Sequence, residues 1–224
     1  MAQYRKDPLL NGNLYHIYTR SIAKYVVFND PYEYERIFEL LHLCQYKDFS
    51  YRLSQFNRLT QISKNDIVEN LKINNNLHVK VVAYCLMPTH IHLILQQISK
   101  NGIEKYMSKI LNGYSRYFNV KHQRTGPLWS TRFKSVLVKD DEQLLHLTRY
   151  IHLNPTSAEI IEKTEDWEYS SYKEYIDISN KLLCDFRSLS NINPKSYKKF
   201  VNDRKDYQKE LSKIKSLIID DYSG

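Results

Sequence analysis

Two adjacent apolar segments constrain the fold of this chain most. Residues 79–87 (VKVVAYCLM) and residues 90–97 (HIHLILQQ) are rich in apolar residues, several of them β-branched, which is typical of buried strands. Only Pro88 and Thr89 separate them, and so short a break favours an antiparallel pair. The chain is therefore expected to be built around a sheet that contains both strands.

Other segments supply the remaining elements. Residues 14–20 (LYHIYTR) alternate apolar and polar side chains as a strand does, and residues 133–138 (FKSVLV) give a fourth strand. Helices are predicted from Pro31 to about Tyr46 behind the cap Asp30, from Gly102 to about Lys121, and from Asp140 to Asn154 before Pro155. This order predicts an α+β fold, a split β-α-β (ferredoxin-like) antiparallel sheet with helices on one face and a C-terminal helical appendage.

Two regions fall outside that core. Residues 48–76 are polar and irregular, with a short helical pattern from Asp66 to Ile73, and are interpreted as an insertion. Residues 166–224 are interpreted as a helical extension that includes a Lys-rich amphipathic helix from about Pro194 to Ile219. The lysines of this helix could grip DNA, or its apolar stripe could simply dock on the domain.

The composition limits the partners and the compartment. The net charge of +8 favours polyanions, with nucleic acid ahead of an anionic membrane, and some of the 19 tyrosines could stack on unpaired bases. A basic protein without a polyanion partner fits the charge as well. The three cysteines are far apart, so neither a Cys-x-x-Cys zinc site nor a disulfide framework is indicated. With no apolar signal core and no stretch long enough to span a bilayer, we expect a cytoplasmic protein.

Candidate chemistry lies in two segments. His90 and His92 are two apart in a predicted strand, so they share a face and could bind one divalent metal ion, although a His-x-His pair is more often two ordinary histidines. In the last predicted helix, Tyr150 and Asn154 share a face, with His146 one turn earlier. From spacing alone, a core tyrosine of an amphipathic helix is the slightly favoured interpretation of Tyr150.

Several ordered blocks together carry a family resemblance. MPTHIHLIL, GPLWSTRFKS and RYIHLNP, with LYHIYTR before them and WEYSSY after them, resemble the single-tyrosine HUH (His-hydrophobic-His) transposases, especially the REP-associated tyrosine transposases. The blocks span about residues 14 to 175. Two positions depart from the expected pattern: Thr89 stands where we expect Asn, and Ser21 where we expect Gly.

The resemblance implies a catalytic domain over residues 1–165 and a role for each matching residue. His90 and His92 would bind Mg²⁺ or Mn²⁺, Asn154 would be the third ligand, and Tyr150 would be the nucleophile, with His146 one turn earlier as a residue that could orient its phenol. The implied activity cuts and rejoins hairpin-bearing single-stranded DNA through a 5′-phosphotyrosine. Two imidazoles and an amide would by themselves suit Zn²⁺ or Co²⁺ better than Mg²⁺. Of the two ions that the resemblance implies, Mn²⁺ therefore fits these ligands better.

Six cations are expected to contact DNA phosphates, although each could also belong to an ordinary solvated surface. They are Arg116, Lys121, Arg124, Arg132, Lys134 and Lys139. Two other functions stay open: a non-catalytic nucleic-acid-binding module of RRM-like fold, and a relaxase or replication-initiator nickase. The paired histidines and the tyrosine helix favour the transposase, which would act in the bacterial cytoplasm at the nucleoid, as a monomer or a homodimer.

Overall fold

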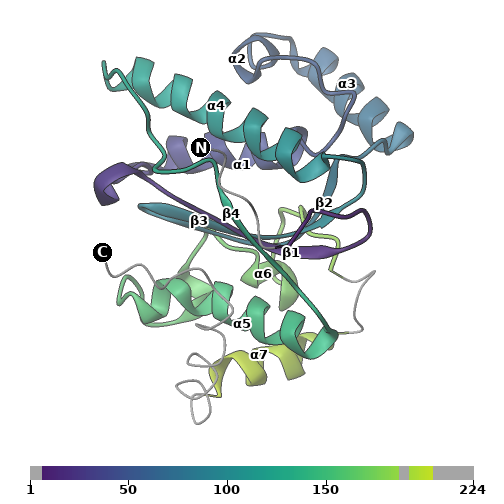
Figure 1. The fold of residues 1–224 in the computed structure, drawn as a ribbon, viewed down its shortest axis with the longest axis vertical. Coiled ribbons are helices and arrows are strands. Elements are labelled where there is room, and N and C mark those ends of the chain that lie inside the picture. Colours follow the sequence, from purple (N-terminus) through teal and green to yellow (C-terminus); the bar gives the residue numbers. More distant parts are fainter. Residues whose placement is uncertain (1–6, 187–191, 204–224) are drawn as a thin grey trace.

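A four-stranded antiparallel sheet lies at the centre of the structure, a computed structural model that describes residues 7–186 and 192–203 (Figure 1). Its strands are β1 (Leu14–Arg20), β2 (Val79–Met87), β3 (His90–Gln97) and β4 (Lys134–Leu137), in the order β2-β3-β1-β4. Each neighbouring pair is antiparallel. The predicted α+β fold class is confirmed, and the bounds of the first three strands are those that the sequence indicated.

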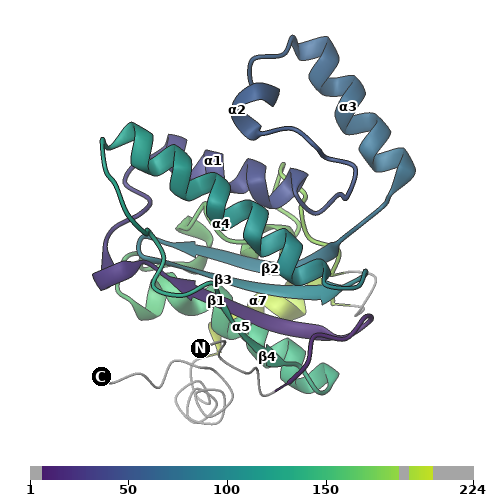
Figure 2. The same ribbon diagram turned by 45° about the horizontal axis from the view of Figure 1, so that its top comes forward.

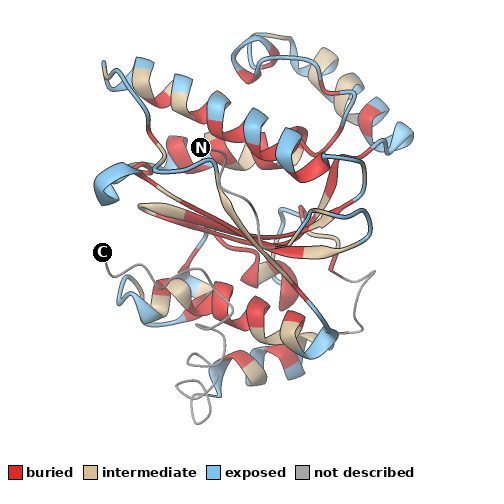
Figure 3. Cartoon of the chain, viewed as in Figure 1, coloured by how far each residue is buried: buried red, intermediate tan, exposed pale blue. Residues whose placement is uncertain are grey.

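The sheet has helices on both faces, which corrects the prediction of helices on one face. Helices α1 (Pro31–Leu43) and α4 (Gly102–Lys121) cover one face, while α5 (Asp141–Ser157), α6 (Tyr172–Tyr175) and α7 (Pro194–Asn202) lie on the other (Figure 1). The reason lies in the central strands, whose successive residues point to opposite faces and yet are buried alike. Both faces therefore need a covering layer, and Figure 3 shows the buried residues gathered there.

The two helices that follow an aspartate begin where expected. Asp30 accepts a hydrogen bond from the Glu33 amide at 3.0 Å, and Asp140 accepts one from the Gln143 amide at 2.7 Å. The end of α5 differs, because the helix continues past Pro155 to Ser157. A proline in the last turn removes only one amide donor, and the ladder continues with a 2.9 Å bond from the Ala158 amide to the Asn154 carbonyl.

The 48–76 segment contains α2 (Leu53–Phe56), which the sequence did not reveal, and α3 (Gln61–Asn74). Both project beyond α1 and α4 (Figure 2). Helix α3 starts five residues before the predicted Asp66, since Thr60 caps it by accepting a 3.2 Å bond from the Ser63 amide.

The chain after α5 returns to the outer edge of β2. A short helical turn, η2 (Thr164–Asp166), lies on this path between α5 and α6, and a similar turn, η1 (Ile22–Lys24), connects β1 to α1. The Leu86 amide donates to the Tyr169 carbonyl at 2.9 Å, and the Ser171 amide donates to the Tyr84 carbonyl at 3.0 Å. These bonds cover an edge that would otherwise expose unpaired backbone groups.

Helix α7 packs against the α5 layer through Tyr197 and Val201, which are both buried. The apolar side of the predicted Lys-rich helix therefore docks on the domain over this stretch. The remainder of that predicted helix, up to Ile219, lies outside the described residues. Among the described ranges, no helix is both long enough and apolar enough to cross a membrane.

Candidate active site

Strand register gathers polar side chains beneath α5. His92 pairs with Tyr18, and His90 pairs with Arg20, across the β1–β3 ladder. Because directly paired residues share a face, His90, His92, Tyr18 and Arg20 emerge on the same side of the sheet, together with His16 two residues earlier in β1. A largely apolar sheet therefore carries one polar patch on the α5 side.

The two histidines of the HUH motif are placed to share one ligand. The ring centroids of His90 and His92 are 5.0 Å apart, with an angle of 84° between the ring planes. A metal ion lies about 2.1 Å from a ligating imidazole nitrogen, hence about 3.2 Å from the ring centroid, and two such ligands at about a right angle have centroids about 4.5–5 Å apart. The observed separation fits a single divalent ion.

Each of these rings has one nitrogen occupied by a neighbouring side chain. The hydroxyl of Thr89 lies 2.9 Å from Nδ1 of His90, and Nε2 of His16 lies 3.1 Å from Nδ1 of His92. With Nδ1 of each ring paired in this way, Nε2 is the nitrogen that would bind a metal ion. Thr89, one of the two departures from the family pattern, thus supports the histidine beside it.

The second departure is also accommodated. Ser21 has φ −64°, a value open to any residue, so a glycine is not required there. Its amide donates to the Thr89 carbonyl at 2.8 Å, which ties the end of β1 to the turn before His90.

Burial keeps His92 in the form that binds metals. The side chain is 1% exposed, and burial lowers the pKa of His92 well below its ordinary value, with His90, His16 and Arg20 lowering it further. A neutral imidazole retains the lone pair that a metal requires.

Tyr150 lies on α5 directly over this patch. Its ring meets His92 edge-on, with centroids 5.8 Å apart and planes at 90°, and meets His16 at 6.4 Å and 83°. The residue is 8% exposed, so the ring is buried. All three side chains belong to one chain.

Asn154 follows Tyr150 by one turn. Its side-chain nitrogen donates to the Tyr150 carbonyl at 3.3 Å, which leaves the side-chain oxygen as the atom for a ligand. The described residues contain no cluster of three or more His, Cys, Asp or Glu side chains suited to a metal ion. Asn154 as a third metal ligand stays a prediction.

A buried polar network positions α5. The His152 ring bonds the Tyr197 hydroxyl at 2.7 Å and the Ser171 hydroxyl at 2.8 Å, and so joins α5 to α7 and to the segment beside β2. Burial lowers the pKa of His152 to about 3. A neutral histidine with both nitrogens bonded fixes the helix that carries Tyr150.

His146 has partners on the α7 side of the helix. Its ring lies 5.5 Å from that of Phe200, and its Nδ1 lies 3.2 Å from the Arg149 guanidinium. A role for His146 in orienting the Tyr150 phenol stays a prediction.

Comparison with known proteins identifies the family. A family model described as "Transposase IS200 like" matches residues 12–154, more than half of the chain, including both histidines and Tyr150. The chain belongs to the IS200-like transposase family.

Two relatives agree with this assignment. The chain is 31% identical over 103 residues to a putative REP-associated tyrosine transposase of Haemophilus influenzae, a match that covers 42% of this chain and 58% of that relative. A solved structure of a REP-associated tyrosine transposase bound to a REP hairpin is similar over 83% of this chain and 98% of that chain, with a TM-score of 0.51 and 12% identity. At that identity the likeness supports the fold.

The six cations predicted to bind DNA do not form one surface in this IS200-like chain. Lys134 pairs with Tyr18 across the β1–β4 ladder and so shares the face of the histidines. Lys121 and Arg124 are held within the protein, by Asp30 at 2.6 Å and by the Pro127 carbonyl at 2.9 Å, respectively. Arg116 and Arg132 line separate cavities, and Lys139 precedes α5. Contact of all six with DNA stays a prediction.

Three residues of β1 were missed as members of the transposase site. His16 bonds His92, Tyr18 lies 4.9 Å from His92 between ring centroids, and Arg20 lies over the Tyr18 ring at 5.5 Å. A signal was present, since these residues are the polar half of the alternation in LYHIYTR. Their position beside His90 and His92 depends on the register between β1 and β3, which cannot be deduced from the sequence alone.

Proposed function

We propose that this chain is a DNA transposase and single-strand endonuclease, which cuts and rejoins hairpin-bearing single-stranded DNA with Tyr150 as the nucleophile. The observation that carries the proposal is the edge-on contact of Tyr150 with His92, at 5.8 Å between ring centroids, within one chain of the IS200-like family. A non-catalytic RRM-like module would have no need of a tyrosine packed over paired histidines.

The proposed metal site consists of Nε2 of His90, Nε2 of His92 and the side-chain oxygen of Asn154. Thr89 and His16 hold the opposite nitrogens of the two rings and so orient them. A bound Mg²⁺ or Mn²⁺ would offset the charge that develops on the phosphate oxygens during displacement.

The proposed reaction is a transesterification. The Tyr150 oxygen forms a bond to the scissile phosphorus and loses its proton, while the bond from phosphorus to the 3′ oxygen breaks and that oxygen takes up a proton. A phenol has a pKa near 10, so it needs activation at neutral pH. The product is a 5′-phosphotyrosine and a free 3′-hydroxyl, and attack by a 3′-hydroxyl reverses the step. Joining therefore needs no ATP.

The proposed substrate follows from the relatives and the charge. A structurally similar REP-associated tyrosine transposase is bound to a REP hairpin, and the net charge of this chain is +8. Arg20 and Lys134, on the face of the histidines, would contact the phosphates beside the cut.

The ends of the cleaved DNA test the proposal. A hairpin oligonucleotide labelled at either end is incubated with the protein and Mn²⁺ and then denatured. We expect one fragment with a free 3′-hydroxyl that a polymerase extends, and a second fragment that migrates with the protein until protease is added. A free 5′-phosphate at the first turnover would indicate hydrolysis by water and would contradict the phosphotyrosine mechanism.

A further inference from the structure

A cavity of about 600 Å³ lies on the side of the molecule away from Tyr150. It is lined by α1, α4 and residues 49–54 of the 48–76 segment and is open to solvent. Helices α1 and α4 cover the sheet face opposite α5, so the sheet separates this cavity from the histidines (Figures 1 and 2).

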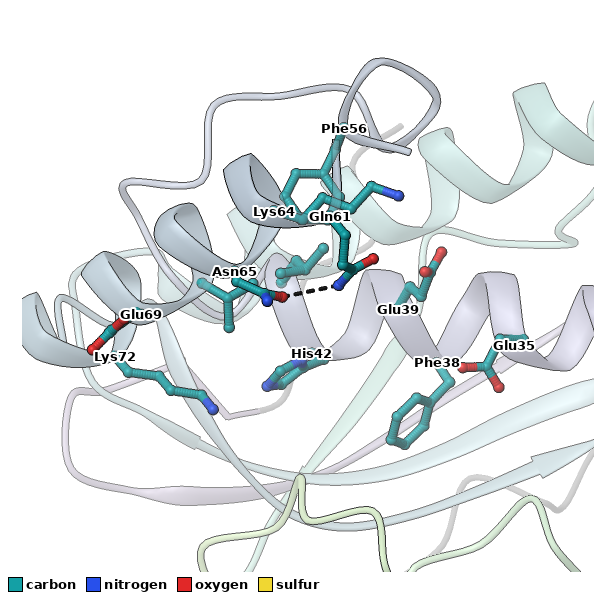
Figure 4. A pocket seen from close by; sticks show the side chains of 12 residues that line it. Glu35, Phe38, Glu39, His42, Phe56, Gln61, Lys64, Asn65, Glu69 and Lys72 are labelled. Carbon is teal, nitrogen blue, oxygen red and sulfur yellow. Dashed lines mark hydrogen bonds between the residues drawn. The ribbon is translucent and has the colours of Figure 1, made fainter. Parts of the chain in front are cut away.

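The lining of the cavity is strongly cationic. No Asp or Glu of the described residues lines it, whereas five cations do: Arg36, Arg52, Lys109, Arg116 and Lys121. A hollow of similar volume between α1 and α3 provides a contrast (Figure 4), because Glu35, Glu39 and Glu69 there accompany Lys64 and Lys72. Of these two hollows, only the first is lined by cations without a carboxylate, and such a lining favours an anionic ligand.

The cations differ in how far the protein already uses them. Lys121 pairs with Asp30 and Glu33 at 2.6 and 2.9 Å, and Lys109 donates to the Phe49 carbonyl at 3.2 Å. Arg116 is exposed, and its side chain has no hydrogen bond or ion pair within residues 7–186 and 192–203. Arg116 is thus available to a ligand without breaking an existing contact.

Arg36, which also lines the cavity, is a second cation that could bind an anionic ligand. Its Nε atom is buried and has no hydrogen-bond partner in the described part of the chain. The guanidinium lies over the Tyr117 ring at 5.0 Å, and burial lowers the pKa of Arg36. A buried donor without an acceptor costs free energy, and an acceptor bound in the cavity would relieve that cost.

The rest of the lining suits a planar group. Tyr51 is 43% exposed, and Tyr117 and Phe49 add further ring surface. Gly113 of α4 also lines the cavity and contributes no side chain to fill it; a Cβ added there would contact only the Leu40 side chain, at 3.4 Å. The volume is far larger than a phosphate ion needs and falls within the range of small-molecule sites.

We propose that this cavity binds a phosphorylated nucleotide, with the phosphate held by Arg36, Arg52 and Arg116 and the base stacked on Tyr51. Arginine suits phosphate through paired donors, and base stacking on tyrosine is sequence-tolerant. The nucleotide is either one unit of an unpaired DNA strand or a free nucleoside phosphate. Neither case requires Tyr150 or a metal, so the inference is independent of the proposed function.

The test uses the full chain in EDTA, so that no metal-dependent cleavage occurs, and titrates thymidine 5′-monophosphate by calorimetry. Arg52→Met and Arg116→Met are each expected to weaken binding about tenfold, which corresponds to the loss of one charged hydrogen bond. Arg58→Met is the matched control, since Arg58 is exposed in the same segment and does not line the cavity, and it should stay within twofold. Thymidine without phosphate should bind at least tenfold more weakly.

Cross-linking locates the ligand and separates its two sources. An eight-nucleotide single strand with 4-thiothymidine should cross-link to Tyr51. Tighter binding of this strand than of the mononucleotide, lost in the same two variants, indicates DNA as the source, and equal binding indicates a free nucleotide. Equal losses in Arg52→Met and Arg58→Met, or adducts that map only outside the cavity, would overturn the proposal.

Discussion

The Nε2 atom of His16 lies 3.1 Å from the Nδ1 atom of His92, between neighbouring strands of the sheet. Both rings are buried and nearly coplanar, with 6° between their planes. If Nε2 of His92 binds a metal, its proton sits on Nδ1 and is donated to His16. His16 therefore selects the tautomer and the orientation of His92, and acts as a positioning residue.

The first prediction concerns that bond. His16→Phe keeps the ring volume and removes the acceptor, so Mn²⁺ affinity should fall about 10- to 100-fold. His16→Gln, whose amide can still accept at this position, should recover part of the loss. Calorimetry gives the affinities, and ¹⁵N shifts of His92 report its tautomer. If His16→Phe melts at a lower temperature and yet binds Mn²⁺ as the wild type does, His16 is only a packing residue.

The second prediction concerns the metal itself. The double variant His90→Ala/His92→Ala should lose Mn²⁺ binding altogether, because both imidazoles of the proposed site are removed. His42→Ala is the control, since His42 lies on α1, which covers the opposite face of the sheet (Figure 1), and the Mn²⁺ affinity of this variant should be unchanged. Equal binding by the wild type and the double variant would remove the metal assignment.

The third prediction is a pH dependence of stability. Burial lowers the pKa of His152 to about 3, whereas in the unfolded chain it is near 6.5. Between these values the unfolded state binds the extra proton, so the contribution of His152 is fully present above pH 6.5 and is lost as the pH falls toward 3. The slope is at most about 1.4 kcal/mol per pH unit.

Urea denaturation of the wild type and of His152→Gln across that range measures the effect. The difference in unfolding free energy between the two proteins should shrink as the pH falls from 6.5. A difference that stays constant with pH would mean that His152 does not resist protonation in the fold.

The fourth prediction concerns DNA. The protein should prefer hairpin-bearing single strands to plain duplex, and its affinity should fall steeply with salt. Lys134→Met, on the face of the histidines, should lower the slope of log affinity against log salt by about one, whereas Lys64→Met on α3 should leave it unchanged. Fluorescence anisotropy at several salt concentrations checks both. Tighter binding to plain duplex would argue against a single-strand substrate.

Local patterns were sufficient to predict most elements and two parts of the site. The strand that carries His90 and His92 and the cap at Asp140 depend on residues close in sequence. Because the HUH histidines are two apart and Tyr150 and Asn154 are four apart, each pair shares a face once its element forms.

Long-range pairing accounts for what the sequence could not supply. His16 faces His92 only because of the β1–β3 register, which joins residues 76 apart. The cavity beside residues 49–54 depends on how that segment packs against α1 and α4. The end of α5 was predicted at Asn154 because Pro155 follows it. The helix continues past Pro155 because hydrogen bonds such as that from the Ala158 amide to the Asn154 carbonyl still form in its last turn.

The most direct test of the account is the covalent bond at Tyr150, which is one of 19 tyrosines in the chain. Tyr150→Phe removes one oxygen from a buried ring, so the fold, the metal affinity and hairpin binding should be retained. With labelled hairpin oligonucleotide and Mn²⁺, the wild type should form an adduct that peptide mapping places at Tyr150, and the variant should form none and leave the DNA uncut. Cleavage by Tyr150→Phe at a rate comparable to that of the wild type would contradict the account and would assign the attack to water or to another tyrosine.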